Sequence, residues 1–244
     1  SRLKWEESFD MDLGAIFESQ FFVNFQDIIL PAIASTIRML FFSMVFGMII
    51  GIATAILLVM ISPYGLNPKP KLYSFVGFWV NMIRSFPVII LIMAMSPLTR
   101  AIIGTSVGEK AAIVPLTVAA FPVIARYIEA SLLEVDRNVI LAARSFGASN
   151  FQILTKVMFV EALPSIISGM TTTVILFLAS TALAGAVGAG GLGAVAITFG
   201  YQRFDDVMMY CIVAILFVMV LLIQGFGELL YRRVKKGNKK APKV

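Results

Sequence analysis

The sequence predicts an all-α integral membrane protein with five transmembrane helices, and three observations support this prediction. The composition is 59% hydrophobic and only 14% charged, whereas soluble domains carry about 25% charged residues. Several uncharged runs are long enough to cross a hydrocarbon core of about 30 Å. Basic residues gather in a few connecting segments and in the C-terminal tail, as the positive-inside rule expects of cytoplasmic segments.

Residues 1–38 are predicted to form an extracytoplasmic N-terminal segment. The first twenty residues are acidic and lack an apolar core, so we expect no signal peptide there. Residues 21–37 have the pattern of an amphipathic segment that breaks at Pro31 and lies along the membrane interface. The membrane domain is predicted to cover residues 39–230.

The first span is predicted at Met39–Ile61, which contains no charged residue. At 1.5 Å per residue it is about 35 Å long, enough to cross the bilayer. Gly47 and Gly51 form a GxxxG pattern, which permits close packing of another helix.

The second span is predicted within residues 72–98, and Arg84 is its one charged residue. An arginine in mid-membrane costs about 2.5–3.5 kcal/mol on insertion scales. We therefore expect the span itself to start near Ser85, with residues 72–83 as a lead-in on the interface or against a partner. Arg84 then extends to the lipid headgroups; the alternative is that Arg84 lies in a transport path.

The third span is predicted at residues 111–133. Arg126 and Glu129 are three residues apart within it. This spacing places them on one helix face, where they can form an ion pair.

Residues 162–202 carry no charge. As a single helix they would be about 60 Å long, twice the membrane core, so this run must break. The break is predicted at the glycines, with the fourth span at Ser165–Ala184 and a loop or re-entrant piece at residues 186–200. The glycines of the break are Gly185, Gly188, Gly190, Gly191 and Gly193.

The fifth span is predicted at Val207–Gly227, followed by a basic tail at residues 231–244. Five spans place the two termini on opposite sides of the membrane. The positive-inside rule puts the basic tail in the cytoplasm. The N-terminus is then outside, and the loops at residues 62–71 and 134–162 face the cytoplasm.

The loop at residues 134–162 is predicted to form a helix-turn-helix. Asp136 is placed to cap a helix that runs to Phe146, and Gly147 can adopt the left-handed conformation that ends it. Ser149 and Gln152 have the spacing of a capping box, so a second helix starts at once. Two interpretations remain open: a simple connector, or a docking element for a soluble partner.

Most chemistry is excluded by what the sequence lacks. It contains no histidine, a single cysteine and no GxxxxGK[ST] phosphate-binding pattern, so no nucleotide, metal or nucleophilic site is predicted. Gly188–Gly193 fits GxGxxG, but no strand precedes it. Aromatic residues lie in apolar runs, which argues against nucleic-acid binding. The uncharged cores of spans one, four and five hold no carboxylate for proton coupling. Energy must therefore come from a partner, or the flow is passive.

Several motifs together resemble the membrane subunit of methionine-type ABC importers. They are Arg84–Leu91, Pro97–Arg100, Gly104–Gly108, Ala111–Thr117, Glu161–Pro164, Gly185–Gly193 and Gly200–Phe204. The cytoplasmic loop resembles that family's Glu-Ala-Ala pattern, and Ala142, Ala143 and Gly147 match it. Leu141 replaces the glutamate, Val157 the isoleucine, and Phe159-Val160 the Leu-Pro, which appears later at Leu163-Pro164.

The resemblance implies a type I ABC importer permease fold in the bacterial cytoplasmic membrane. It implies a homodimer of permeases, two cytoplasmic ATPase subunits that bind ATP and magnesium, and an extracytoplasmic substrate-binding lipoprotein. No cofactor is expected in this chain, and the implied substrate is methionine, in the L or D form. The alternatives are a permease of the same architecture for another solute and, from a different class, an ATPase-independent channel or secondary carrier.

Two sets of site residues follow from these interpretations. The ATPase-coupling set is Leu141, Ala142, Ala143, Gly147, Ala148, Ser149, Phe151, Leu163 and Pro164. The candidate translocation pathway runs along spans four and five, and its polar groups are Thr171, Thr172, Thr173, Ser180 and Thr181. Hydroxyls bonded back to their own helix are the equally open alternative for that second set.

Overall fold

The computed structural model describes residues 25–240, without the side chains of residues 237–240. Every regular element in that range is a helix. Four helices are long and apolar enough to cross a membrane, and a bent pair of helices raises the number to five. The all-α prediction is therefore confirmed, and the amphipathic prediction for residues 21–24 lies outside the described residues.

The first long helix joins a π-helical turn, η1 (Phe25–Ile29), to α3 (Leu30–Ile61). The predicted break at Pro31 is wrong, because the helix continues through it. Pro31 is the second residue of α3, which follows directly on the π-helical turn η1, whose hydrogen bonds run from residue i to i+5 rather than i+4. The predicted domain boundary after residue 38 thus falls inside α3.

Helix α3 packs most extensively against α7 (Glu109–Leu133). A Cβ on Gly47 would lie 2.8 Å from Ala120 Cβ, and one on Gly51 would lie 2.9 Å from Ile124 Cβ. Both distances are too short for real side chains, so the two glycines let the helices approach closely. The packing predicted from the GxxxG pattern is confirmed.

The second span is a bent pair rather than one straight helix. Helix α4 (Pro70–Ser85) and α5 (Val88–Ala94) meet at a bend of 100°. Phe86 precedes Pro87 and is extended, with φ −77° and ψ 132°, as a residue before proline prefers. The expected continuous span from Ser85 to Leu98 is therefore wrong. Residues 72–83, which were predicted to lead into the span, form most of α4, the longer of the two helices.

The chain then forms α6 (Ser96–Ile103), which ends at the left-handed Gly104. Helix α7 follows, close to the predicted third span. After the short helix α8 (Arg137–Ser145), the elements α9 (Asn150–Gln152), η2 (Ile153–Met158) and α10 (Phe159–Ala186) form one uninterrupted helix. The fourth span therefore begins in the predicted cytoplasmic loop, before Ser165.

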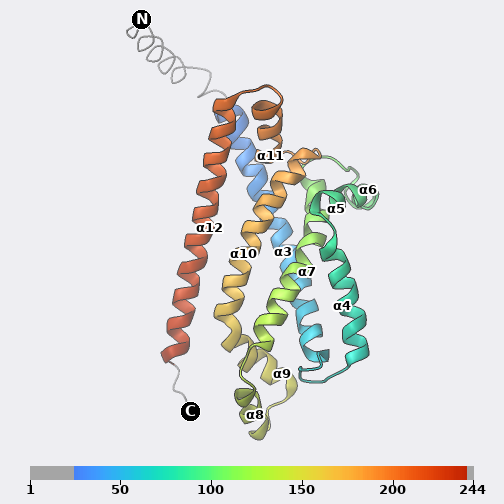
Figure 1. Cartoon of the computed structure of the whole chain (residues 1–244), viewed down its shortest axis with the longest axis vertical. Coiled ribbons are helices and arrows are strands. Elements are labelled where there is room, and N and C mark those ends of the chain that lie inside the picture. The colour runs from blue at the N-terminus through green and yellow to red at the C-terminus, as the bar shows by residue number, and fades with distance from the viewer. Residues whose placement is uncertain (1–24, 241–244) are drawn as a thin grey trace, which may run out of the picture.

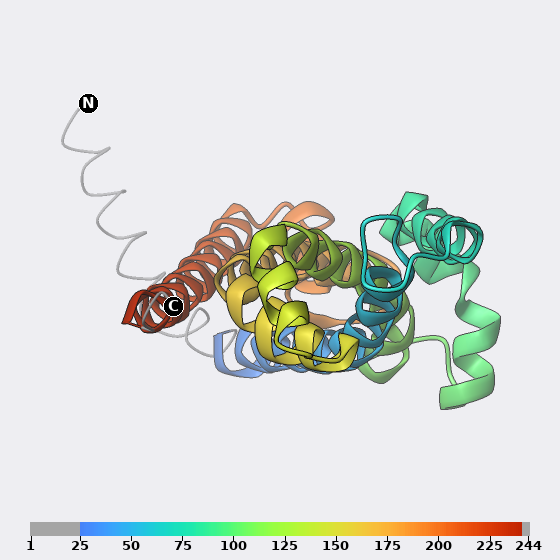
Figure 2. The same ribbon diagram turned by 90° about the horizontal axis from the view of Figure 1, so that it is seen from below.

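The predicted glycine break is confirmed, since α10 ends at Ala186. The piece beyond it is helical, formed by α11 (Gly191–Val195) and η3 (Ala196–Tyr201). The last helix is α12 (Asp206–Lys240), which contains the predicted fifth span. Helices α3, α7 and α10 form the centre, with α12 on one side and α4 to α6 on the other (Figures 1 and 2).

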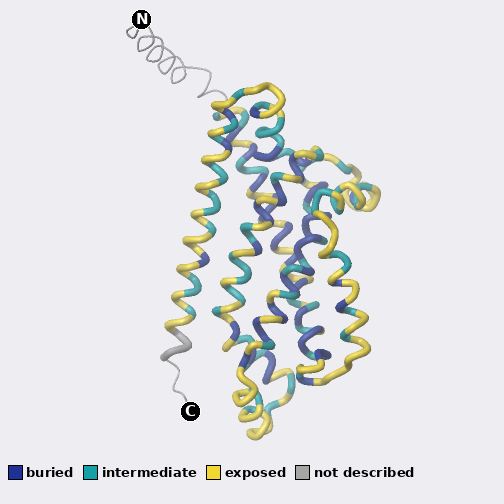
Figure 3. Tube along the Cα trace, viewed as in Figure 1, coloured by how far each residue is buried: buried dark blue, intermediate teal, exposed yellow. Residues whose placement is uncertain are grey.

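The two ends of the bundle carry different elements. Helices α8 and α9, the loop after α3 and the end of α12 lie at one end, and α6 and α11 lie at the other (Figure 1). Buried residues concentrate in α3, α7 and α10, while α12 is mostly exposed and half-buried (Figure 3). The bundle thus has a packed centre and an apolar periphery.

Candidate functional site

The end of the bundle that carries α8 presents a helix-turn-helix, which we call the elbow and define as residues 134–153. Asp136 caps α8 as predicted, since its Oδ1 accepts a hydrogen bond of 2.9 Å from the Asn138 amide. The acceptor satisfies one of the free amides at the start of the helix. Helix α8 has nine residues and none of them is buried, so hydrogen bonds at its ends contribute much of its stability.

The turn of the elbow depends on Gly147, whose φ is +78°. Its amide donates to the Arg144 carbonyl at 2.9 Å, and the Ala148 amide donates to the Ala143 carbonyl at 3.1 Å. This pair of bonds is the Schellman arrangement that ends helices at a left-handed glycine. The predicted left-handed turn at Gly147 is confirmed.

A capping box restarts the chain directly after the turn. Ser149 Oγ accepts from the Gln152 amide at 3.3 Å, and Gln152 Oε1 accepts from the Ser149 amide at 2.9 Å. Ile153 and Leu154 are then buried in the main core. The elbow is therefore held at its second arm by the bundle, while α8 projects from it.

The loop between α3 and α4 supports the elbow from the side. The Leu66 carbonyl accepts hydrogen bonds from Arg144 Nη2 at 3.1 Å and from Asn150 Nδ2 at 3.4 Å. The Arg137 guanidinium lies 5.6 Å from the centre of the Tyr64 ring, a cation–π contact. Sequence reasoning did not identify Tyr64 or Leu66, because carbonyl acceptors and cross-loop contacts leave no spacing pattern.

Large apolar side chains of the elbow are exposed. Phe146 is 88% exposed, Phe151 70% and Leu141 57%. Monomeric soluble surfaces rarely gather such groups without a partner to cover them. The arrangement favours a docking element over a simple connector.

The predicted coupling residues divide into three groups. Leu141, Ala142, Gly147, Ser149 and Phe151 are exposed on the elbow. Ala143 and Ala148 are half-buried and pack against the core. Leu163 and Pro164 lie inside α10 and are not part of the elbow, so the structure does not bring them together with the other seven.

The five predicted pathway hydroxyls all bond back to their own helix. Thr171, Thr172, Thr173 and Ser180 donate to carbonyls four residues earlier, and Thr181 to one three residues earlier. Thr173, Ser180 and Thr181 are buried. Thr171 and Thr172 face a hollow of about 310 Å³ beside α12.

Ser180 alone among the five lines a larger, half-open cavity of about 530 Å³ between α4, α5, α7 and α10. We call it the central cavity. Its other lining residues are Ile83, Arg84, Phe86, Val88, Ala119, Val123, Arg126, Tyr127, Ala130, Leu176 and Phe177. Ser180 and Arg84 thus line the same cavity, together with residues of α4 and α7 that were not among the predicted pathway residues.

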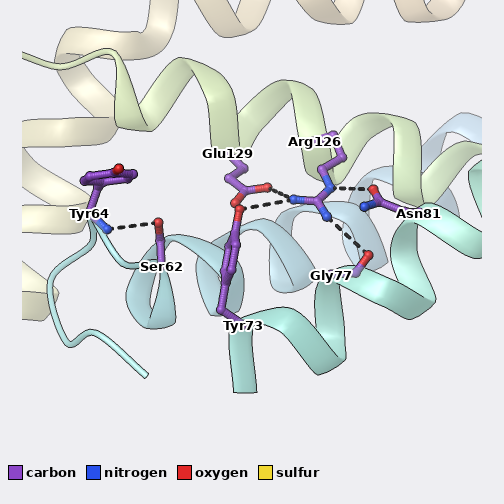
Figure 4. Close-up of polar contacts among 7 residues, drawn as sticks. All are labelled: Ser62, Tyr64, Tyr73, Gly77, Asn81, Arg126 and Glu129. Carbon is purple, nitrogen blue, oxygen red and sulfur yellow. Dashed lines mark hydrogen bonds and ion pairs between the residues drawn. The ribbon is translucent and has the colours of Figure 1, made fainter. Parts of the chain in front are cut away.

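A partly buried polar cluster joins α4 to α7 next to this cavity (Figure 4). The predicted ion pair is confirmed, with Arg126 Nη1 2.8 Å from Glu129 Oε2. Arg126 also donates to Asn81 Oδ1 at 3.2 Å, to the Gly77 carbonyl at 3.2 Å and to the Tyr73 hydroxyl at 3.4 Å. Gly77, Asn81 and Arg84 follow a helical spacing that places all three on one face of α4.

The glycine break is held by backbone contacts at the opposite end of the bundle. A Cβ on Gly193 would lie 2.2 Å from the Ala182 carbonyl oxygen, and one on Gly185 would lie 2.4 Å from the Ala194 amide nitrogen. The Leu192 amide donates to Thr36 Oγ1 at 2.9 Å, which ties α11 to α3. Gly188, Gly190 and Gly191 have positive φ and make the turn between the two helices.

No group of three or more acidic, histidine or cysteine side chains in residues 25–236 is arranged to hold a metal ion. The long helices and the exposed elbow are the features that carry a function. Comparison with known proteins identifies what they resemble. The family model described as binding-protein-dependent transport system inner membrane component matches residues 47–236.

Three relatives and two solved structures are similar over most of the chain. A probable D-methionine transport system permease protein, MetI, of Vibrio cholerae is 41% identical over 88% of this chain and 96% of its own length. MetI of Escherichia coli K12 is 45% identical over 62% of this chain and 69% of its own length. The methionine import system permease protein MetP of Bacillus subtilis is 39% identical over 67% of this chain and 73% of its own length.

The MetNI methionine ABC transporter, solved in inward-facing conformations, contains a chain with a TM-score of 0.83 and 42% identity. It covers 85% of this chain and 96% of that one. A chain of an amino acid ABC transporter, crystallised with histidines, gives a TM-score of 0.72 at 21% identity, and the match covers 87% of this chain and 96% of that chain. At this identity the similarity shows a shared fold only.

Proposed function

The chain belongs to the family of binding-protein-dependent transport system inner membrane components, and from that premise we propose that it is the permease subunit of an ATP-driven importer for methionine. It forms the translocation pathway across the bacterial cytoplasmic membrane. The relatives named for methionine transport and the MetNI structure support this substrate. The D-methionine names of two relatives favour uptake of the D as well as the L form.

The permease is a transport subunit and not an enzyme. ATP is hydrolysed on two separate cytoplasmic ATPase subunits, which bind the nucleotide and its magnesium. Two copies of the permease form the membrane part, and an extracytoplasmic lipoprotein delivers the substrate. The family description names the binding-protein dependence, and the MetNI likeness supports the assembly with an ATPase.

The proposed topology has five spans with α4 and α5 together as the second. The N-terminus is outside and the basic tail is cytoplasmic. The loop after α3, the elbow and the end of α12 share one end of the bundle (Figure 1), and basic residues in or next to the first two lie there: Lys69, Arg137, Arg144 and Lys156. The described basic residues at that end, which include Arg232, Arg233, Lys235 and Lys236 of α12, support a cytoplasmic assignment for it.

The observation that carries the proposal is the exposed apolar face of the elbow. The elbow docks on the ATPase, with Phe146, Phe151 and Leu141 as its anchors, since buried aromatic anchors dominate binding energy at interfaces. Closure of the ATPase dimer moves the two elbows together, and the helix from Asn150 to Ala186 transmits that movement along the bundle without a joint. The ATPase can bias the two conformations only through differential contact with this element.

Reconstitution of the complete transporter tests the proposal. The permease, co-expressed with its ATPase and purified in complex, is placed in liposomes with ATP inside and binding protein and labelled methionine outside. We expect methionine uptake that requires ATP and the binding protein. Uptake by the permease without the ATPase would contradict the proposal and favour a channel or secondary carrier.

A further inference from the structure

A long apolar groove lies between α3, α10 and α12, on the side of the bundle that carries α12 (Figures 1 and 2). Its volume is about 750 Å³, which exceeds that of the central cavity. The residues that line it fall within residues 37–48 of α3, 166–174 of α10 and 222–230 of α12. The groove therefore joins the peripheral helix α12 to two helices of the packed centre.

The lining of this groove does not suit an amino acid or another polar solute. Among the described residues that line it, Thr171 alone has a polar side chain, and its hydroxyl donates to the Ile167 carbonyl at 2.9 Å. A charged amino or carboxyl group placed there would lose its hydration without gaining a partner. An acyl chain has no such requirement, so the lining fits the hydrocarbon of a lipid.

The face of α12 that lines the groove continues into a cluster of basic residues. Leu222, Phe226 and Arg233 have the spacing of residues on one helical face. At 1.5 Å per residue, Arg233 lies about 10 Å beyond Phe226 along the helix axis. Arg232, Arg233 and Lys236 border one hollow of about 370 Å³. We call residues 232–236 the basic end of α12.

The basic end carries more positive charge than its neighbours compensate. Arg232 pairs with Glu228 at 2.6 Å. Arg233 and Lys236 are exposed and form no ion pair with any residue in the described part of the chain. These two charges are therefore available to an anionic partner.

The arginine beside the α3 wall of the groove is different, because it is neutralised. Arg38 follows the lining residue Ile37, and its guanidinium donates to both carboxylate oxygens of Glu109, at 2.6 and 2.7 Å. The positive charge that lacks a counter-charge thus lies on the α12 side of the groove. Basic residues next to the end of a transmembrane helix attract anionic lipid headgroups.

We propose that the groove and the basic end of α12 together bind an anionic phospholipid, with an acyl chain in the groove and the phosphate at Arg233 and Lys236. Phosphate oxygens accept strong, charge-assisted hydrogen bonds from guanidinium and ammonium groups. Lipid tails are as apolar as the groove, so contact with hydrocarbon gives little selectivity among lipids. The headgroup charge therefore decides which lipid binds. This site goes beyond the proposed transport function and does not depend on the identity of the solute.

Lipid titration of the complete transporter tests the charge requirement. The complex is stripped of lipid in detergent and titrated with dioleoyl phosphatidylglycerol, which is anionic, or dioleoyl phosphatidylethanolamine, which is neutral, and bound lipid is counted by native mass spectrometry. We expect the tightest site to bind phosphatidylglycerol at least fivefold more tightly. Arg233→Gln combined with Lys236→Gln should lower this preference at least threefold. Equal affinity for the two lipids in the unmodified transporter would overturn the proposal.

The matched control is Lys69→Gln combined with Lys71→Gln, which removes the same charge at the same end of the bundle. Both lysines are exposed, lie at the start of α4 and line no part of the groove. The preference for phosphatidylglycerol should stay nearly unchanged in this variant. An equal loss in the two double variants would show that overall charge attracts the lipid, and the proposed site would be refuted.

A photoreactive lipid locates the acyl chain in the unmodified transporter. Phosphatidylglycerol with a diazirine in its acyl chain is irradiated with the complex in nanodiscs, and the adducts are mapped by mass spectrometry. We expect adducts within residues 37–48, 166–174 and 222–230, reduced by excess phosphatidylglycerol and not by excess phosphatidylethanolamine. Adducts that are equally frequent at the exposed Phe75 and Phe78 of α4 would indicate bulk lipid and contradict the site.

A cysteine in the groove tests whether a second copy of the chain fills it instead. Phe226→Cys is made in a Cys211→Ala background and oxidised in the membrane. We expect no disulfide between two copies, because lipid occupies the groove. A disulfide-linked dimer, together with no lipid adduct in the groove, would assign this surface to contact between two permeases and overturn the proposal.

Discussion

Replacement of Gly147 by alanine tests whether the left-handed turn gives the elbow its docking shape. Gly147 has a φ of +78°, and an added Cβ would meet no atom within 4 Å. The substitution therefore introduces conformational strain without a clash. That strain is about 1–2 kcal/mol for a residue with a side chain.

If the chain releases this strain by changing the turn, the conformation that docks on the ATPase is disfavoured by the same free energy. Since about 1.4 kcal/mol is a factor of ten in affinity, we expect the ATPase to bind about 5- to 30-fold more weakly. Gly147→Asn should lose less, because asparagine adopts the left-handed conformation more readily. The assay is the affinity of the purified ATPase for the permease in nanodiscs.

The matched control is Gly225→Ala in α12. A Cβ there also meets nothing within 4 Å, and its backbone does not have the positive φ of Gly147. Alanine is a better helix former than glycine by about 1 kcal/mol, so this variant should be neutral or slightly stabilised. Thermal unfolding should be unchanged in both variants. Wild-type affinity of Gly147→Ala would refute the argument that the turn shapes the docking surface.

Three further predictions concern the bundle. Glu129→Ala leaves the partly buried Arg126 without its carboxylate partner, and because Arg126 keeps its bonds to Asn81, Tyr73 and Gly77 the free energy of unfolding should fall by about 1–3 kcal/mol, measured by denaturant titration. Glu228→Ala removes an exposed i,i+4 pair with Arg232 and should cost under about 1 kcal/mol. Equal losses in the two variants would contradict the burial argument. Gly193→Ala places a Cβ 2.2 Å from the Ala182 carbonyl oxygen and should lower the melting temperature of the purified permease well below that of Gly225→Ala. Phe146→Ala removes an 88% exposed side chain, so stability should hold while affinity for the ATPase falls at least tenfold; unchanged affinity would exclude Phe146 as an anchor.

The sequence predicted those features that depend on short-range patterns. The cap at Asp136, the turn at Gly147 and the capping box at Ser149 follow from hydrogen bonds within a few residues. The glycine break followed from length, because an uncharged run of about 40 residues would, as one helix, be about twice as long as the hydrocarbon core. The pair of Arg126 and Glu129 followed from helical spacing.

The features that were missed are of two kinds: the local effects of two prolines, and contacts between segments far apart in the chain. Pro31 was expected to break the first helix, but one helix runs through it from Phe25 to Ile61, with a π-helical turn just before the proline. The extended Phe86 before Pro87 turns the second span by 100°, which hydropathy does not register. Neither the central cavity nor the contacts of Leu66 with Arg144 and Asn150 has a sequence signal.

One measurement tests the central claim most directly: accessibility of a single cysteine at residue 146, made as Phe146→Cys in a Cys211→Ala background. A membrane-impermeant maleimide should label it in inside-out vesicles and not in intact spheroplasts, and bound ATPase should block the label. Labelling from the outer side, or labelling that the ATPase does not reduce, would contradict a cytoplasmic elbow that docks on the ATPase.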